Sequence, residues 1–146
     1  MTMIRVRPLR PSDDGAIDRL AEQARIEGFR FLDRLRQELA IDNGARDTPR
    51  AFFLVIEDES GVVGVGGVTE DPYAANSAVG RIRHVYIAAE TRRRGLGRML
   101  VAALETRACC AYAILRLRTD TEAGARFYEA LGYGAVADSS ATHVKQ

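Results

Sequence analysis

The sequence predicts an α/β (α+β) fold, a single domain in which a central sheet of about seven strands is flanked by about four helices. The length of 146 residues is typical of one domain that buries its own core, so we expect residues 1–146 to form one unit. Hydrophobic residues make up 47% of the chain and charged residues 28%, an ordinary balance for a globular protein. Short runs with strand character alternate with longer segments whose apolar residues recur at helical spacing.

In the first half of the chain, alternating or continuous apolar runs predict three strands, and apolar residues at helical spacing predict two helices. In chain order these are a strand over residues 4–9, a helix capped by Ser12-Asp13-Asp14, a second helix over about residues 29–40, a loop at residues 43–49, and strands over residues 51–56 and 62–68, separated by a turn at residues 57–61. The continuous apolar run at 51–56 is typical of a strand that is covered on both faces.

In the second half, the same patterns predict two helices and four strands. The expected elements are a polar loop at residues 70–77, a strand that ends at Ile87, a helix after Gly97, a strand over residues 113–118, a helix over residues 123–131 with Gly132 as its C-cap, and a hairpin of residues 133–137 and 142–145. Thr119 and Glu122 can form a capping box at the start of the last helix.

The segment of residues 82–100 carries the clearest chemical signal. It predicts a strand, a short basic turn with three consecutive arginines at residues 92–94, and a helix whose start carries Gly95 and Gly97. A helix start has N–H groups without internal partners and a partial positive charge. Glycines let a phosphate approach these N–H groups closely. The segment therefore predicts a site for a phosphorylated ligand.

Two common phosphate-binding motifs do not match this turn. A P-loop requires a lysine after its second glycine, and Arg98 stands in that place. A dinucleotide fingerprint requires a third glycine, and that position is Leu100. The turn also lacks the N-terminal strand that would lead into it in a dinucleotide-binding unit.

Charge and cysteine content restrict the partners and the location. With 21 Lys and Arg against 20 Asp and Glu, the net charge of +1 and the absence of an aromatic-basic platform argue against nucleic acid as a partner. No stretch approaches transmembrane length and the start lacks a signal peptide, so we expect no membrane association. The adjacent Cys109 and Cys110 are unsuited to pair with each other, which favours a reducing cytoplasm. We expect no metal site.

Two motifs in this chain resemble signatures of the GNAT acyltransferase superfamily. The run Arg92-Arg93-Arg94-Gly95-Leu96-Gly97 resembles its acetyl-CoA signature R/Q-x-x-G-x-G/A, and residues 125–133, ARFYEALGY, resemble its second signature. The predicted order of strands and helices is also the order of that family, so the resemblance covers nearly the whole chain. It implies a mixed, mostly antiparallel sheet that is splayed between the fourth and fifth strands.

The resemblance also implies acetyl-CoA as co-substrate and a set of residues that bind it. Backbone N–H groups of the turn and helix start would hold the pyrophosphate, and the strand before the turn would pair with the pantetheine arm. The implied cofactor-binding residues are Val85, Tyr86, Ile87, Arg92, Arg93, Arg94, Gly95, Leu96, Gly97, Arg98, Thr121 and Tyr128. Thr121 stands where the family commonly has an asparagine.

The same resemblance suggests Tyr128 as general acid, because a phenol stays protonated at neutral pH and can donate to a departing thiolate. The alternative is a packed core tyrosine. A strand N–H near Val85 or Tyr86 would stabilise the oxyanion. The family's frequent acidic residue early in the fourth strand is replaced here by an arginine at position 81, so the general base is open among Glu70, Asp71 and His84.

We therefore expect transfer of an acetyl group from acetyl-CoA to a primary amine of a small molecule or of a peptide or protein. The alternative is a CoA-binding regulatory or accessory module without turnover. Phe29, Phe31, Glu70 and Asp71 suggest a partly apolar, acidic acceptor pocket that suits a cationic amine. Edge strands would allow a homodimer.

Overall fold

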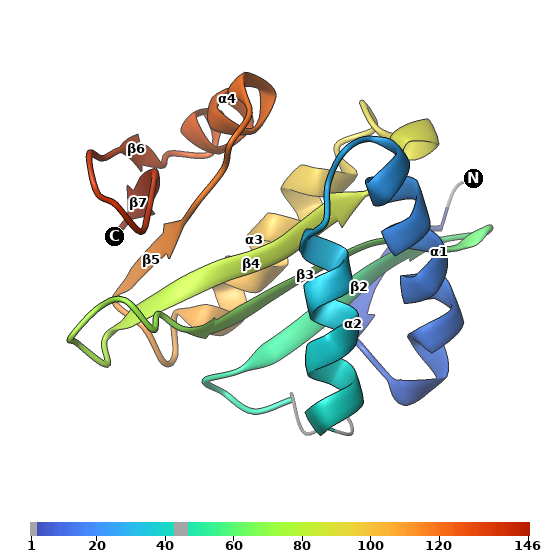
Figure 1. The fold of residues 1–146 in the computed structure, drawn as a ribbon, viewed down its shortest axis with the longest axis horizontal. Coiled ribbons are helices and arrows are strands. Elements are labelled where there is room, and N and C mark those ends of the chain that lie inside the picture. Colours follow the sequence, from blue (N-terminus) through green and yellow to red (C-terminus); the bar gives the residue numbers. More distant parts are fainter. Residues whose placement is uncertain (1–2, 43–46) are drawn as a thin grey trace.

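The computed structural model describes residues 3–42 and 47–146. Its centre is one seven-stranded sheet with the order β1-β2-β3-β4-β5-β7-β6 (Figure 1). The strands are β1 (Arg5–Pro8), β2 (Phe52–Asp58), β3 (Gly61–Glu70), β4 (Val79–Ile87), β5 (Ile114–Leu117), β6 (Gly134–Ala135) and β7 (His143–Lys145). All neighbouring strands are antiparallel except β4 and β5, which are parallel. The predicted mixed, mostly antiparallel sheet is confirmed.

Helices cover both faces of this sheet. They are α1 (Asp14–Ile26), α2 (Phe31–Asp42), α3 (Leu96–Ala108) and α4 (Glu122–Ala130). The helices α1 and α2 lie on one face, α3 lies on the other, and α4 lies beside the C-terminal strands (Figure 1). Among the described helices, none combines the length and the apolar character that crossing a membrane would require.

Burial on both faces of the sheet explains the amino-acid composition of β2 and β3. The apolar run of β2 is buried from Phe52 to Ile56, as expected for a strand between two helical layers. In β3 a glycine makes room for that run, because a Cβ at Gly67 would lie 2.1 Å from the Phe53 ring. The glycine-rich sequence of β3 is therefore a packing requirement of the core.

The sheet opens between β4 and β5. Their parallel pairing is limited to Val79–Arg81 of β4 with Ile114–Arg116 of β5, although β4 continues to Ile87. Beyond this point β5 diverges from β4 and leads toward α4 (Figure 1). The predicted splay between the fourth and fifth strands is thus present, and it leaves the second half of β4 open on one side.

Several predicted boundaries move by a few residues. The turn expected at residues 57–61 is shorter, because pairing with β3 extends β2 to Asp58. The loop expected at residues 70–77 begins one residue late, since Glu70 still pairs with Gly80. The expected loop residues Asn43 and Gly44 lie outside the described residues.

Candidate active site

The turn between β4 and α3 combines a left-handed backbone with an exposed helix start. After a short 3-10 turn at Ala89–Thr91, Gly95 is the N-cap of α3 with φ of 78°. Arg93 also has a left-handed backbone, with φ of 67°. The first N–H groups of α3 have no acceptor within the helix and carry its partial positive charge. This geometry is compatible with an anion bound through the backbone, which stays a prediction.

Gly97 has a second role that the motif alone does not indicate. A Cβ at this position would lie 3.2 Å from the Phe127 ring of α4 and 3.7 Å from Ile87 of β4. The glycine therefore lets α4 approach the end of β4. This contact brings α4, the helix that carries Tyr128, against the start of α3.

Arg92 is engaged by its side chain with α1 rather than directed at solvent. Its Nη1 and Nη2 donate to the carboxylate of Glu27 at 2.7 and 2.8 Å, and its Nε donates to the carbonyl oxygen of Ile87 at 2.9 Å. The guanidinium also lies 5.3 Å from the Tyr86 ring, whose hydroxyl donates to Glu27. The Arg92 guanidinium lowers the pKa of Glu27. The Arg92 side chain therefore holds the end of β4 against Glu27, the C-cap residue of α1.

The other arginines of the turn differ in their surroundings. Arg94 pairs with Asp58 at 3.1 Å, which ties the turn to the end of β2. Arg93 and Arg98 are exposed and have no ion pair within residues 3–42 and 47–146. These two side chains are the cations that a phosphate group can reach most readily.

A β-bulge interrupts β4 just before the turn. Val65 of β3 pairs with Tyr86 and Gly67 pairs with Arg83, so two residues of β4, His84 and Val85, lie opposite one residue of β3. His84 accordingly has φ of 60°, a left-handed value that is uncommon outside glycine. A bulge leaves an extra backbone group outside the ladder. Such an N–H is suited to stabilise an oxyanion, as expected near Val85 and Tyr86.

The bulge directs His84 into a buried position between β4 and α2. Its side chain is only 4% exposed, and Nε2 lies 3.7 Å from Glu38 Oε1. Neither ring nitrogen has a hydrogen-bond partner in the described part of the chain. Burial, reinforced by the charge of Arg83, lowers the pKa of His84 to about 4. The imidazole is therefore neutral at physiological pH.

This buried imidazole makes the folded state acid-sensitive. The pKa of His84 is lowered to about 4 in the folded protein, while the unfolded chain has the ordinary value of about 6.5. Its contribution is complete above about pH 6.5 and is lost as the pH falls toward 4, at most roughly 3 kcal/mol. We expect His84→Gln to lose less free energy of unfolding than the wild type between pH 7 and pH 4. Urea titrations at both values measure this difference, and equal losses would contradict it.

Tyr128 lies in a cluster of aromatic rings on α4. Its ring contacts Phe127 and Tyr133 edge-on, with centroid distances of 5.0 and 5.6 Å. The residue is 8% exposed, and its hydroxyl has no hydrogen-bond partner within the described residues. Burial raises the pKa of Tyr128, so the phenol stays protonated over the neutral range. A packed tyrosine whose hydroxyl makes no hydrogen bond is compatible with the predicted role of Tyr128 as general acid.

Thr121 caps α4, and the capping box predicted from Thr119 and Glu122 is wrong. The Thr121 side chain accepts a hydrogen bond from the Gly124 N–H at 3.0 Å and is the N-cap of the helix. Because Thr121 has the extended backbone of an N-cap, Glu122 is already the first helical residue. A contact between the Thr121 hydroxyl and a pantetheine arm remains a prediction.

The two loop carboxylates lie at the opposite end of β4 from the bulge. Glu70 pairs in register with Gly80, about four strand residues or 13 Å before His84. Its side chain is exposed and lies 3.5 Å from Arg50. Asp71 is fully buried, and its carboxylate accepts a hydrogen bond from the Tyr73 N–H at 2.8 Å. The turn and the bulge thus lie at one end of β4, and Glu70 and Asp71 lie at the other.

Sequence reasoning missed Glu27 and Glu38, which connect the two first helices to β4. Glu27 holds Arg92, and Glu38 Oε1 accepts from Arg83 Nη2 at 2.6 Å. Glu38 follows Phe31 by seven residues, so both lie on one face of α2. The sequence feature that could have identified Glu38 is a carboxylate on an otherwise apolar face of a helix.

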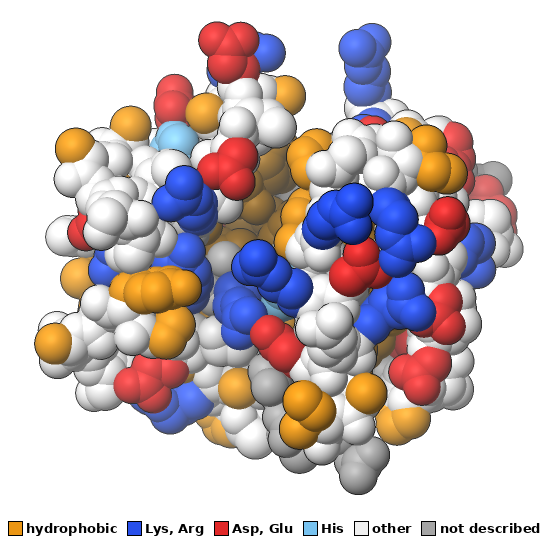
Figure 2. Space-filling view, viewed as in Figure 1, with side chains coloured by type: hydrophobic (Ala, Val, Ile, Leu, Met, Phe, Trp, Pro, Cys, Tyr) orange, Lys and Arg blue, Asp and Glu red, His pale blue; other side chains and the backbone are white. Residues whose placement is uncertain are grey.

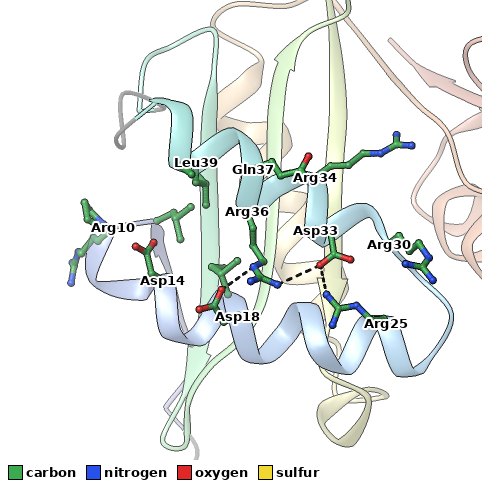
Figure 3. Close-up of a pocket in the computed structure, with 14 residues that line it drawn as sticks. Arg10, Asp14, Asp18, Arg25, Arg30, Asp33, Arg34, Arg36, Gln37 and Leu39 are labelled. Carbon is green, nitrogen blue, oxygen red and sulfur yellow. Dashed lines mark hydrogen bonds and ion pairs between the residues drawn. The ribbon is translucent and has the colours of Figure 1, made fainter.

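A large cavity of about 1030 Å³ lies elsewhere, along the groove between α1 and α2 (Figure 3). It is lined mainly by charged side chains, and Arg36 there pairs with Asp18 at 2.9 Å and Asp33 at 3.4 Å. None of the turn residues borders it. The turn and the bulge remain the predicted site, because the exposed N–H groups of the α3 start and the irregular backbone of β4 lie there.

Comparisons with known proteins agree with this geometry. The family model of the acetyltransferase (GNAT) domain matches residues 49–134. A putative acetyltransferase from Exiguobacterium sp. is similar in structure, with a TM-score of 0.85, 24% identity, and coverage of 99% of this chain and 93% of that one. Salmonella typhimurium yncA, a putative acetyltransferase with acetyl-CoA, has a TM-score of 0.71, 17% identity, and coverage of 97% and 90%. No curated protein matches the chain by sequence.

N-acetylglutamate synthase from Neisseria gonorrhoeae, crystallised with coenzyme A and L-arginine, is a third structural neighbour. Its TM-score is 0.73 at 18% identity, and the match covers 99% of this chain but 33% of the larger enzyme. The family model spans more than half of the chain and includes the turn and Tyr128. The chain therefore belongs to the GNAT acetyltransferase family, and the resemblance inferred from its two motifs is confirmed.

Proposed function

We propose that the protein is an N-acetyltransferase that uses acetyl-CoA and acetylates a primary amine of a small molecule or peptide. One observation carries this proposal: the open half of β4 joins a bulge with a buried neutral imidazole to a turn with unpartnered helix N–H groups. The contact of Phe127 with Gly97 brings α4, which carries Tyr128, against that turn. Two structural neighbours crystallised with coenzyme A or acetyl-CoA support the same ligand here.

The residues present fit this co-substrate. The backbone N–H groups from Arg92 to Arg98 would hold the pyrophosphate, with the exposed Arg93 and Arg98 side chains adding positive charge. The backbone of Val85–Ile87, unpaired on the β5 side, would pair with the pantetheine arm as an added strand. Acetyl-CoA supplies an acetyl group that is activated as a thioester.

The chain's own groups then have defined tasks. A backbone N–H at the bulge, at Val85 or Tyr86, stabilises the negative charge that develops on the carbonyl oxygen. Tyr128 donates its phenolic proton to the departing sulfur, because its raised pKa keeps it protonated. An amine attacks only when neutral, so a base must remove its proton.

Among the candidate bases, the geometry favours His84. It is part of the bulge, it is neutral, and its Nε2 lies 3.7 Å from Glu38 Oε1, which is longer than a hydrogen bond. Asp71 is held between two arginines, and Glu70 lies at the far end of β4. We therefore assign the proton transfer to His84, directly or through a water.

We expect His84→Gln to lower kcat/KM for an amine by about 10²-fold or more, while Glu70→Gln leaves it unchanged. Because the pKa of His84 is about 4, the base stays neutral throughout the assay range. The rise of kcat/KM with pH is then expected to follow the deprotonation of the amine substrate. Initial rates from pH 6 to 9 measure this, and a large loss in Glu70→Gln alone would assign the base to the loop.

The alternative is a CoA-binding accessory module without turnover, in which Tyr128 would only pack. Steady-state release of thiol from acetyl-CoA with a panel of primary amines distinguishes the two functions. The proposed enzyme releases thiol in proportion to acetylated amine, whereas a module binds acetyl-CoA and releases none. A cytoplasmic location and a homodimer remain parts of the proposal.

A further inference from the structure

Three arginines, Arg81, Arg83 and Arg116, form a strip on the α2-facing side of β4 and β5. Arg83 Nη2 donates to Glu38 Oε1 of α2 at 2.6 Å. Arg81 Nη2 donates to the Ser140 carbonyl oxygen at 2.7 Å, and Arg116, opposite it in register, donates to Ser140 Oγ at 2.8 Å. On this face, Lys and Arg side chains gather around a hollow between the α1–α2 side and the α4–β5 side (Figure 2).

Two arginines of the strip share one buried carboxylate. Asp71, with a side chain that is 0% exposed, lies 3.5 Å from Arg81 and 3.6 Å from Arg116. These distances are too long for hydrogen bonds, and Asp71 Oδ2 and Arg81 Nη1 are buried without a partner in the described residues. The other nearby carboxylate, Asp138, is 46% exposed, so solvent screens its pair with Arg116. One buried carboxylate thus faces two guanidinium groups.

Arg83 is the member of the strip that a ligand can reach. Its side chain is 28% exposed, against 11% and 13% for the other two. A guanidinium has five N–H donors in a planar fork that matches a carboxylate, and the 2.6 Å hydrogen bond to Glu38 is made through one of them, on Nη2.

Arg83 directly precedes His84 in the bulge. The two side chains approach the same carboxylate of Glu38, at 2.6 and 3.7 Å, so they lie on the same side of β4. A site with these neighbours offers a cation for an anionic group and a neutral imidazole for an amine, on adjacent residues. Because both contact Glu38 Oε1, Arg83 Nη2 and His84 Nε2 can be no farther apart than the sum of those two distances.

We propose that the acceptor is an amine that carries a carboxylate close to its amino group, with the carboxylate held by Arg83 and the amino group next to His84. This inference rests on the proposed acetyltransferase function. It reverses the cationic acceptor expected from Glu70 and Asp71, because Asp71 is shared by two arginines and Glu70 lies at the far end of β4. Coulomb attraction in this partly buried site would favour a carboxylate over a neutral or cationic group.

Matched acceptor pairs test the inference. The assay compares β-alanine with β-alaninamide and phenylalanine with phenylalaninamide, with cadaverine as a cationic acceptor. Because an amide lowers the pKa of the neighbouring amine, kcat/KM is expressed per concentration of neutral amine. We expect the wild type to prefer the carboxylate member of a pair by tenfold or more, and to use cadaverine worse than either.

Variants of the site should change this preference in opposite directions. We expect Arg83→Gln to bring the ratio within a pair close to one, and Arg83→Lys to keep part of it. Glu38→Gln removes the competing carboxylate and should raise the ratio. Arg36→Gln is the matched control, since Arg36 pairs with Asp18 and Asp33 in the α1–α2 groove and should leave the ratio unchanged.

Two results would overturn the inference in different ways. Equal kcat/KM for the carboxylate and the amide in the wild type would refute it and leave the acetyltransferase function intact. Failure to acetylate any member of the series, in a protein shown by calorimetry to bind acetyl-CoA, would overturn the proposed function together with the inference. An unchanged ratio in folded Arg83→Gln and Arg83→Lys would remove Arg83 from the acceptor site.

Discussion

Replacement of Tyr128 by phenylalanine should lower kcat by roughly 10²- to 10⁴-fold, the range that general acid catalysis contributes. The ring contacts with Phe127 and Tyr133 would persist, because only the hydroxyl is removed. That hydroxyl has no hydrogen-bond partner within the described residues, so we expect the free energy of unfolding to change little. Thiol release measures kcat, and calorimetric titration should show unchanged affinity for acetyl-CoA.

Tyr133→Phe is the matched control for this variant. Tyr133 lies 5.6 Å from Tyr128, and its hydroxyl donates to Glu105 at 2.7 Å. We expect this variant to lose about 1 kcal/mol of stability and to keep its kcat. Equal turnover in the wild type and in Tyr128→Phe across the pH range would show that the sulfur leaves without a proton from this residue.

Gly97→Val should weaken acetyl-CoA binding by at least tenfold, about 1.4 kcal/mol. The added side chain would occupy the space through which a phosphate reaches the N–H groups at the start of α3. It would also press on the Phe127 ring, which lies 3.2 Å from the position of a Cβ. Calorimetric titration with acetyl-CoA measures the loss.

A second substitution separates these two causes. Phe127→Leu makes room beside residue 97, so the double variant with Gly97→Val relieves the contact with α4. We expect acetyl-CoA affinity in the double variant to stay low, because the side chain still obstructs the backbone of the turn. Recovery of affinity would instead assign the loss to the packing of α4.

Local patterns were sufficient to predict most of the fold. Strands β2 and β3 and all four helices follow from apolar spacing, and the two motifs predict the splayed sheet through the family resemblance. The boundaries that moved depend on partners that are distant in the sequence. Pairing with β3 extends β2 to Asp58, for example, and no local feature of the segment indicates that pairing.

The parts of the candidate site that the backbone forms could be predicted from the sequence. The contacts of its side chains could be predicted less well. The turn follows from Gly95 and Gly97, because a left-handed N-cap and a close approach are properties of single residues. The engagement of Arg92 by Glu27 was not predictable, because 65 residues separate them in the chain. The burial of His84 depends on a bulge, which requires the register of β3 against β4.

A crystal structure with bound coenzyme A tests the central claim most directly. The account predicts the pyrophosphate within hydrogen-bond distance of backbone N–H groups between Arg92 and Arg98, the pantetheine arm along Val85–Ile87, and the sulfur next to the Tyr128 hydroxyl. Coenzyme A bound in the α1–α2 groove, or at the turn with its sulfur remote from Tyr128, would contradict it.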